Sequence, residues 1–348
     1  MKIDLDDKRL QYSGRIDCTD PKHPVFIFPA SSLSFSFVGT GASIVIKNQR
    51  AYWGNYVGII VDGVQRKERL ADTGYTTILL AENLEEKEHS IILFKRQDSC
   101  HVITLEELLL TGAGTLTENL ERPVRRIEVY GDSVSAGEVS EATEYAGKAD
   151  PEHNGEYSNS WYSYGWIAAR KLKAEIHDIA QGGIALQNGT GWFSVPLLLG
   201  MESVWDKLQY NPLFGAVTKW DFRQYTPQVV IVAIGQNDSN PEDYMKTDME
   251  GEKAQRWRDT YRTWIRSIRE KYPKAFIILS TTILEHHENW DASIERVCRE
   301  LNDSRIVHFL YSKNGVGTPG HVRIMEAEQM ADELCAFMEG IAENIWGV

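Results

Sequence analysis

The pattern of apolar residues changes near residue 111, and this change most constrains what the chain can fold into. Before it, short runs rich in β-branched and aromatic residues recur about every 8–12 residues, separated by glycine-containing turns. After it, buried-type strands alternate with segments of helical periodicity. The sequence therefore predicts two domains of different class, with a boundary close to residue 120.

Residues 1–112 are predicted to form an all-β domain. The segment Leu33–Val38 alternates apolar and polar residues, as a strand with one buried face does. Runs of this length and spacing favour an antiparallel sandwich of the jelly-roll type. The other expected strands are Pro24–Phe28, Ser43–Ile46, Tyr56–Val61, Thr76–Ala81, His89–Lys95 and Ile103–Leu110.

Residues 125–348 are predicted to form a parallel α/β domain, joined to the sandwich by a short linker over residues 113–124. The continuous apolar run Val229–Ile234 is typical of a strand buried on both faces of a parallel sheet. Helix Gln255–Tyr272 carries aromatic and apolar residues on one stripe and ends at Pro273. The other expected elements are strands Arg126–Tyr130, Glu175–Ile179 and Ala275–Leu279, and helices Trp161–Leu172, Ile294–Leu301 and Val322–Ile341.

Charge and cysteine usage exclude several classes of function. The net charge is −13, with 37 basic and 50 acidic residues. A protein that binds phosphate backbones normally has a basic surplus, so neither nucleic acid nor an anionic membrane is an expected partner. No apolar run has the length of a signal peptide core or a membrane span. The four cysteines, Cys18, Cys100, Cys298 and Cys335, are scattered, so we expect no disulfide and no metal site. We also expect a cytoplasmic protein without a cofactor. The sequence leaves a homo-oligomer open.

Chemistry-bearing residues follow successive strands of the α/β domain, where ligands of such sheets bind. The first strand runs into Gly131-Asp132-Ser133, a tight turn that can expose a nucleophilic hydroxyl. The second is followed by Gly183, whose missing side chain lets its N–H approach a reacting oxygen. The third runs into Gly235-Gln236-Asn237-Asp238, where an amide can stabilise an oxyanion. His321, after a Gly/Pro loop, is the candidate base.

Each of these segments also has an ordinary structural interpretation. A Gly-Asp-Ser tripeptide is most often only a turn, and a lone histidine near a helix start is most often a surface residue. An asparagine in such a turn usually caps its own backbone. The order of the four segments at successive strand ends is what favours a catalytic site.

The four segments resemble the sequence blocks of the SGNH (GDSL-type) hydrolase superfamily, with Gly183 preferred over Gly182 in the glycine block. The first half resembles the jelly-roll domain of carbohydrate esterase family 2, notably at Ser13–Asp17, Phe28–Ser31 and Phe35–Thr40. The resemblance implies a three-layer α/β/α hydrolase domain. It also implies an esterase that removes acetyl groups from plant-derived carbohydrate, such as acetylated xylo- or manno-oligosaccharides. The implied catalytic residues are Ser133, Gly183, Asn237 and His321.

One position departs from the superfamily. Its third triad member is an aspartate three residues before the histidine, and here that position is Thr318. Threonine carries no charge to orient and stabilise an imidazolium. The resemblance therefore implies a Ser133–His321 dyad whose imidazole is oriented by a backbone carbonyl, with Asp291 or Asp303 as less favoured alternatives.

The substrate side of the site is predicted from aromatic residues and from the serine turn. Trp192 and Trp290 are candidates for stacking on a sugar ring, and sealing the domain interface is an equal alternative. Asp132 is expected at the substrate site, where it braces the serine turn, and Trp53 could reach the site from the sandwich.

Two other functions stay open. One is a non-catalytic carbohydrate-binding protein. The other is an SGNH esterase or acyltransferase that acts on non-carbohydrate short-chain esters. The glycine-rich segment 182–191 does not indicate a nucleotide site, because it lacks the Gly-Lys-Ser/Thr sequence and the required glycine spacing.

Overall fold

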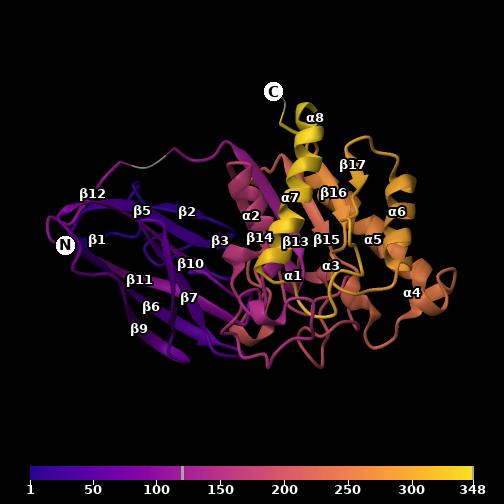
Figure 1. Cartoon of the computed structure of the whole chain (residues 1–348), viewed down its shortest axis with the longest axis horizontal. Helices are drawn as coiled ribbons and strands as arrows, with labels where there is room; N and C mark the ends of the chain where they lie inside the picture. Colours follow the sequence, from indigo (N-terminus) through magenta and orange to yellow (C-terminus); the bar gives the residue numbers. More distant parts are fainter. Residues whose placement is uncertain (119–120, 347–348) are drawn as a thin grey trace.

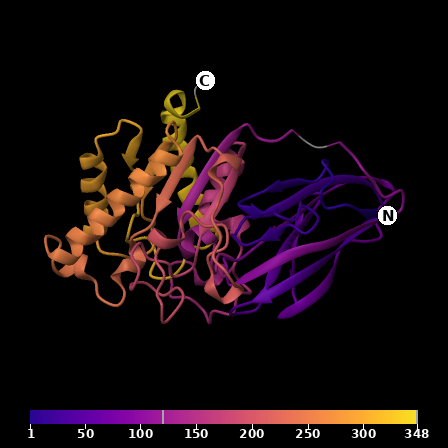
Figure 2. The same cartoon turned by 180° about the vertical axis from the view of Figure 1, so that it is seen from behind.

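The computed structural model describes residues 1–118 and 121–346 as two domains that lie side by side (Figure 1). Helix α7, Ile324–Gly340, covers one face of the C-terminal sheet in Figure 1. Seen from behind in Figure 2, helix α5, Glu252–Lys271, covers the opposite face. The C-terminal domain therefore has helices on both faces of a central sheet, as predicted.

Two antiparallel sheets form the N-terminal domain, which confirms the predicted sandwich. Their facing side chains make one core, to which β5 contributes Leu33, Phe35 and Phe37. The first sheet contains β1 Lys2–Ile3, β3 Ile16–Asp17, β4 Val25–Phe26, β6 Gly41–Arg50, β9 Thr73–Ala81 and β11 His101–Thr111. The second contains β2 Gln11–Ser13, β5 Ser32–Gly39, β7 Tyr56–Val61, β8 Val64–Arg69, β10 Lys87–Lys95 and β12 Thr115–Leu116.

Five of these strands were not predicted: β1, β2 and β3, which are only two or three residues long, and β8 and β12. Strand β8 is an edge strand whose sequence is mostly charged, so it carries no apolar alternation. Strand β12 lies within the predicted linker and pairs with β5, so the sandwich extends to at least residue 116. Residues 119 and 120 of that linker lie outside the described residues.

The C-terminal sheet is parallel, with the strand order β14-β13-β15-β16-β17. Successive residues of β15 face opposite sides: Val230 and Val232 pack with α5, and Val229 and Ile231 pack with α2 and α7. This burial on both faces explains the unbroken apolar runs. The strands are β13 Arg125–Gly131, β14 Ala174–Ala180, β15 Val229–Ala233, β16 Phe276–Ser280 and β17 Ile306–His308.

The four predicted helices are present with different ends, and four short helices were not predicted. The expected helix Trp161–Leu172 is a 3₁₀ turn followed by α2, because Ser163 caps α2 through the backbone N–H of Trp166. Helix α6 begins at Asn289, five residues earlier than predicted. The remaining helices are α1 Ser133–Ala136, α3 Met201–Val204, α4 Tyr244–Thr247 and α8 Ala342–Trp346, with α2 over Tyr164–Lys171 and α6 over Asn289–Leu301. No helix in the described ranges is long and apolar enough to cross a bilayer.

A buried arginine ties the two domains together. Arg15 of the sandwich is fully buried and donates hydrogen bonds to the carbonyl oxygens of Trp205 and Lys207 in the other domain. Its guanidinium also lies 3.5 Å from the carboxylate of Glu128 on β13. A buried charge is tolerated only when it is paired in this way, so the relative placement of the domains depends on these contacts.

Candidate active site

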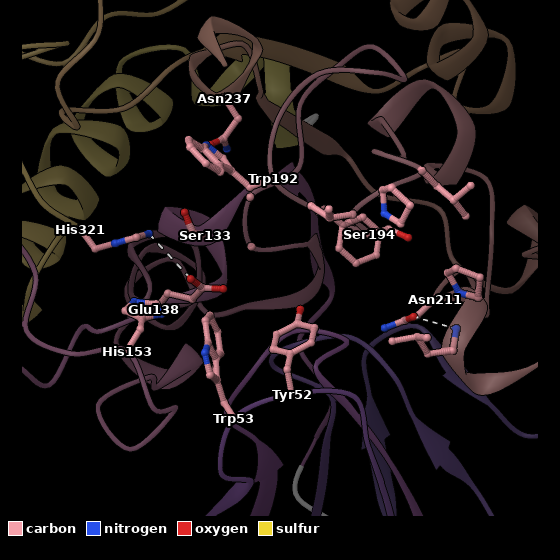
Figure 3. A pocket seen from close by; sticks show the side chains of 18 of the residues that line it. Tyr52, Trp53, Ser133, Glu138, His153, Trp192, Ser194, Asn211, Asn237 and His321 are labelled. Atoms are coloured by element: carbon pink, nitrogen blue, oxygen red, sulfur yellow. Dashed lines mark hydrogen bonds and ion pairs between the residues drawn. The ribbon is translucent and has the colours of Figure 1, made fainter. Parts of the chain in front are cut away.

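A pocket of about 720 Å³ opens at the carboxyl end of the parallel sheet, where both domains contribute to its walls. Figure 3 shows Ser133, His321 and Asn237 around it, with Tyr52 and Trp53 entering from the sandwich. The four predicted catalytic residues, Ser133, Gly183, Asn237 and His321, all line this pocket. The structure thus brings together residues that are up to 188 positions apart in the sequence.

The serine turn is held by Asp132. Its side chain caps α1 by accepting from the N–H of Val134 at 3.0 Å, and it accepts from Gln236 Nε2 at 2.7 Å and Asn237 Nδ2 at 3.2 Å. The side chain is 1% exposed, and burial raises its pKa. Asp132 therefore joins the serine turn to the asparagine turn and offers no surface to substrate, which corrects its predicted placement among substrate-binding residues.

Gly183 and Asn237, the two predicted oxyanion donors, line the same pocket as Ser133. Gly183 has φ +69°, and among the hydrogen bonds of residues 1–118 and 121–346 none uses its N–H. The N–H of Gly182 instead donates to Asp98 Oδ2 at 2.8 Å, which favours Gly183 as the oxyanion donor. The Asn237 amide donates to Ile184 O at 3.0 Å as well as to Asp132, so it is held rigidly beside the pocket.

His321 is oriented by a carboxylate and not by a backbone carbonyl. Its Nδ1 donates to Asp150 Oδ2 at 2.5 Å, and its backbone N–H donates to Asp150 Oδ1 at 2.9 Å. Asp291 instead pairs with His286, and Asp303 with Arg269. The predicted orientation of His321 by a backbone carbonyl and both alternative acids are therefore wrong, because Asp150 is the residue that holds the ring.

Asp150 lies in the loop between two 3₁₀ turns, Thr143–Tyr145 and Ser160–Tyr162. Arg323 Nη2 donates to Asp150 Oδ1 at 2.6 Å. Burial opposes ionisation, but the hydrogen bonds from His321 and Arg323 hold the pKa of Asp150 well below its usual range. A Cβ on Gly320 would lie 2.8 Å from Asp150 Oδ1 and 2.4 Å from the carbonyl oxygen of Lys148, so this glycine lets the loop approach.

Asp150 could not be predicted from the sequence, which contains no local signal for it. The residue is 171 positions from His321 and lies on a loop without periodicity. The one indirect signal is Arg323, two residues after the histidine, because a buried guanidinium requires an acidic partner.

Two further titratable residues near His321 were also missed. Glu138 Oε2 lies 3.7 Å from His321 Nε2, and burial together with Asp98 raises the pKa of Glu138 well above its usual value. Burial and the neighbouring His321 lower the pKa of His153 to about 4.

A hydrogen bond between Ser133 and His321 is not among those of the described residues. Contacts between a nucleophile and its base often tighten only when substrate binds.

The candidate aromatic residues separate into two groups. Trp192 is 63% exposed and lines the pocket, as does Trp53. Trp290 is fully buried, packs edge-on against Trp257 at 5.4 Å and donates to Asp243 Oδ1. Trp290 is therefore a core residue and not a substrate contact, because the early start of α6 turns it inward.

Comparisons with known proteins show that the chain is similar to carbohydrate esterases. Residues 12–119 match the family model described as Carbohydrate esterase 2 N-terminal. The chain is similar to the Cellulase/esterase CelE of Acetivibrio thermocellus, with 28% identity over 96% of this chain and 39% of that protein. It is also similar to an Acetylxylan esterase / glucomannan deacetylase of Cellvibrio japonicus, with 27% identity over 95% of this chain and 88% of that protein.

A solved structure extends the likeness to the arrangement of both domains. The family two carbohydrate esterase from Clostridium thermocellum, in complex with cellohexaose, is 26% identical. The match has a TM-score of 0.79 and covers 96% of this chain and 99% of that chain. The N-terminal domain thus matches the carbohydrate esterase 2 model, and the whole chain is similar in sequence and fold to family two carbohydrate esterases.

Proposed function

We propose that this chain is a serine esterase that removes O-acetyl groups from plant-derived carbohydrate, with acetylated xylo- or manno-oligosaccharides as its substrates. One observation carries the proposal: Ser133, His321, Gly183 and Asn237 line a single pocket, and Asp150 holds the histidine. The relatives named as acetylxylan esterase, glucomannan deacetylase and cellulase/esterase support a sugar ester as the substrate.

In the proposed first step, the Ser133 hydroxyl attacks the acetyl carbonyl and gives its proton to Nε2 of His321. Asp150 keeps the other ring proton on Nδ1, so Nε2 is free to act as the base. The imidazolium then protonates the sugar oxygen as the bond between that oxygen and the acetyl carbon breaks. The products of this step are the free sugar hydroxyl and an acetylated Ser133.

In the proposed second step, His321 takes a proton from water as the water attacks the acetyl-enzyme. Acetate leaves, and the proton returns to Ser133. In both steps the negative oxygen is stabilised by the N–H groups of Ser133 and Gly183 and by the Asn237 amide. In this structure the two Nδ2 hydrogens of Asn237 go to Asp132 and Ile184, so one of these hydrogen bonds must be exchanged for a bond to the negative oxygen.

The sugar is proposed to bind between the two domains. Trp192 on one wall and Trp53 on the other are the pocket residues suited to stacking on a pyranose face. Replacing Trp192 by alanine should raise KM for an acetylated oligosaccharide more than for a small chromogenic acetate, because only the larger substrate extends to this wall.

Loss of acetyl groups, followed by time-resolved NMR on acetylated xylo- and manno-oligosaccharides, tests the proposal. Native protein should release acetate from at least one of them, and a Ser133→Ala variant that melts at the native temperature should not. Ser135→Ala is a matched control, since Ser135 is on the same helix and bonds the hydroxyl of Tyr164. A Ser133→Ala variant with most of its activity intact would contradict the assignment, and a folded native protein that releases no acetate would favour a binding role.

A second candidate function follows from the apolar rim of the pocket. Val195, Leu197 and Leu213 line it and are 72%, 63% and 71% exposed. These side chains could receive an apolar acyl chain, which favours esterase or acyltransferase action on non-carbohydrate short-chain esters. A chain-length series of 4-nitrophenyl esters separates the two: a preference for acetate over butyrate and longer chains supports the carbohydrate deacetylase.

A further inference from the structure

Three side chains of metal-ligating type meet in the wall of the pocket. Glu138, His153 and His321 offer one carboxylate oxygen and two ring nitrogens that all lie within 4.8 Å of one another. They come from three segments: the turn after α1, the loop that carries Asp150, and the loop before α7. Figure 3 shows the three side chains gathered at one corner of the pocket.

Two atoms of this cluster are buried without a partner. Glu138 is 4% exposed, and its Oε1 accepts no hydrogen bond from any described residue; a proton shared with Asp98 contributes to the raised pKa of Glu138, and a bound metal ion would replace that proton. The buried Nε2 of His153 is likewise unpaired within residues 1–118 and 121–346. An unsatisfied buried polar group costs about 1–3 kcal/mol, so a ligand that satisfied both atoms at this corner would be favoured.

The second oxygen of Glu138 faces the catalytic histidine. Its distance of 3.7 Å from His321 Nε2 is too long for a hydrogen bond, and a bound cation would satisfy both atoms. The carboxyl groups of Asp98, Asp132 and Asp150 are close enough to Glu138 to act on its ionisation. This concentration of acidic groups attracts cations to the corner.

We propose that Glu138, His153 and His321 bind a divalent transition-metal ion of the zinc type, and that the bound ion inhibits the esterase. Two imidazoles and one carboxylate form a His₂Glu ligand set of the kind zinc accepts, with the fourth position open to the pocket. Ligands about 2.0–2.1 Å from a tetrahedral zinc lie roughly 3.3 Å from one another. The ligand atoms must therefore approach one another by up to about 1.5 Å for zinc to bind.

Inhibition follows from the atom that His321 has available. Its Nδ1 is held by Asp150, so Nε2 is the nitrogen left for the metal. The lone pair on Nε2 is the one that accepts the proton of Ser133 in the proposed mechanism. A metal–nitrogen bond occupies this lone pair, and a chelator frees it. The inhibition thus rests on the proposed function, whereas the binding of the metal does not.

Metal binding is measured directly on the full chain. Protein treated with chelator is dialysed against graded ZnCl₂, and zinc per chain is determined by mass spectrometry. We expect one zinc per native chain and at least about 10-fold weaker binding for Glu138→Gln and for His153→Phe, since even residues behind the ligands change affinity by that factor. The matched control is His308→Phe on β17, which should bind zinc like the native chain. Melting temperatures identify any variant that does not fold.

Esterase activity on 4-nitrophenyl acetate is followed in the same zinc series, each variant being compared with itself in chelator. The activity of the native chain should fall in proportion to zinc occupancy and return when chelator is added. Glu138→Gln and His153→Phe should need at least about 10-fold more zinc for the same fractional inhibition. Absence of stoichiometric zinc, or native-like zinc affinity in both ligand variants, overturns the site. Full occupancy with unchanged activity overturns the inhibition. A chain that binds zinc but hydrolyses no ester refutes the proposed function and leaves the metal site supported.

Discussion

Replacing Asp150 by asparagine tests the central correction that the structure makes. The carboxylate uses both oxygens: Oδ2 accepts from His321 Nδ1, while Oδ1 accepts from the His321 backbone N–H and from Arg323 Nη2. In the variant, the amide oxygen must face the two donors at the Oδ1 position. The amide nitrogen then faces Nδ1, which can only accept, and the ring proton moves to Nε2. His321 is left in the tautomer that cannot take a proton from Ser133.

The expected loss is large because nothing else in the loop can restore the tautomer. The same change in a Ser-His-Asp triad lowers kcat by about 10⁴-fold, which is about 5 kcal/mol of transition-state stabilisation. We expect at least about 10³-fold for Asp150→Asn, with KM for 4-nitrophenyl acetate little changed, since Asp150 is not among the residues that line the pocket. If a backbone carbonyl oriented the ring, the loss would be less than about 10-fold.

The assay is steady-state hydrolysis of 4-nitrophenyl acetate, with thermal melting to establish that each variant is folded. Asp303→Asn is the matched control: it makes the same chemical change at an acid that pairs with Arg269, and kcat should stay within about twofold. A folded Asp150→Asn variant that keeps more than a tenth of native kcat would refute the reasoning.

Three further predictions follow from single contacts. Asn237→Ala should lower kcat by about 10²–10³-fold without abolishing it, since one oxyanion donor is lost, as steady-state kinetics would measure; a loss under threefold would remove Asn237 from this role. Gly320→Ala should lower kcat because its Cβ would push Asp150 away, whereas Gly340→Ala, with no atom within 4 Å of the added Cβ, should not. Lys95 is fully buried, and burial lowers its pKa to about 8 from 10.5. Between pH 8 and 10.5 the unfolded chain binds the proton that the folded chain has released, so native stability should rise relative to Lys95→Met by at most about 3 kcal/mol in urea unfolding. Parallel pH profiles for the two proteins would contradict this.

The sequence by itself determined the class of each domain and the order of the catalytic segments. Alternating residues in β5 and unbroken apolar runs in β15 reflect burial on one face and on both faces, and this burial can be inferred from composition along the strand. Parallel strands end at one edge of a sheet, so Ser133, Gly183 and Asn237 could be assigned to one site without coordinates.

Helix boundaries were less accessible to sequence, and one error changed a functional assignment. The polar start of α6, Asn289–Asp291, gives little apolar periodicity, so the expected helix began at Ile294. With the helix starting at Asn289, Trp290 belongs to the first turn and packs into the core. An error of five residues in the predicted start of α6 thus accompanied the wrong prediction that Trp290, a core residue, contacts substrate.

Only the tertiary structure decided what surrounds His321. Asp150, Glu138 and His153 lie on turns and loops whose positions depend on packing, on a glycine that admits the chain at Gly320, and on the charge of a buried Arg323. Such contacts join side chains far apart in the sequence, so neither hydrophobic periodicity nor motif spacing predicts them. The sequence therefore pointed to Ser133 and His321 as candidates, whereas Asp150 beside the histidine, and the cluster of Glu138, His153 and His321, are properties of the folded chain.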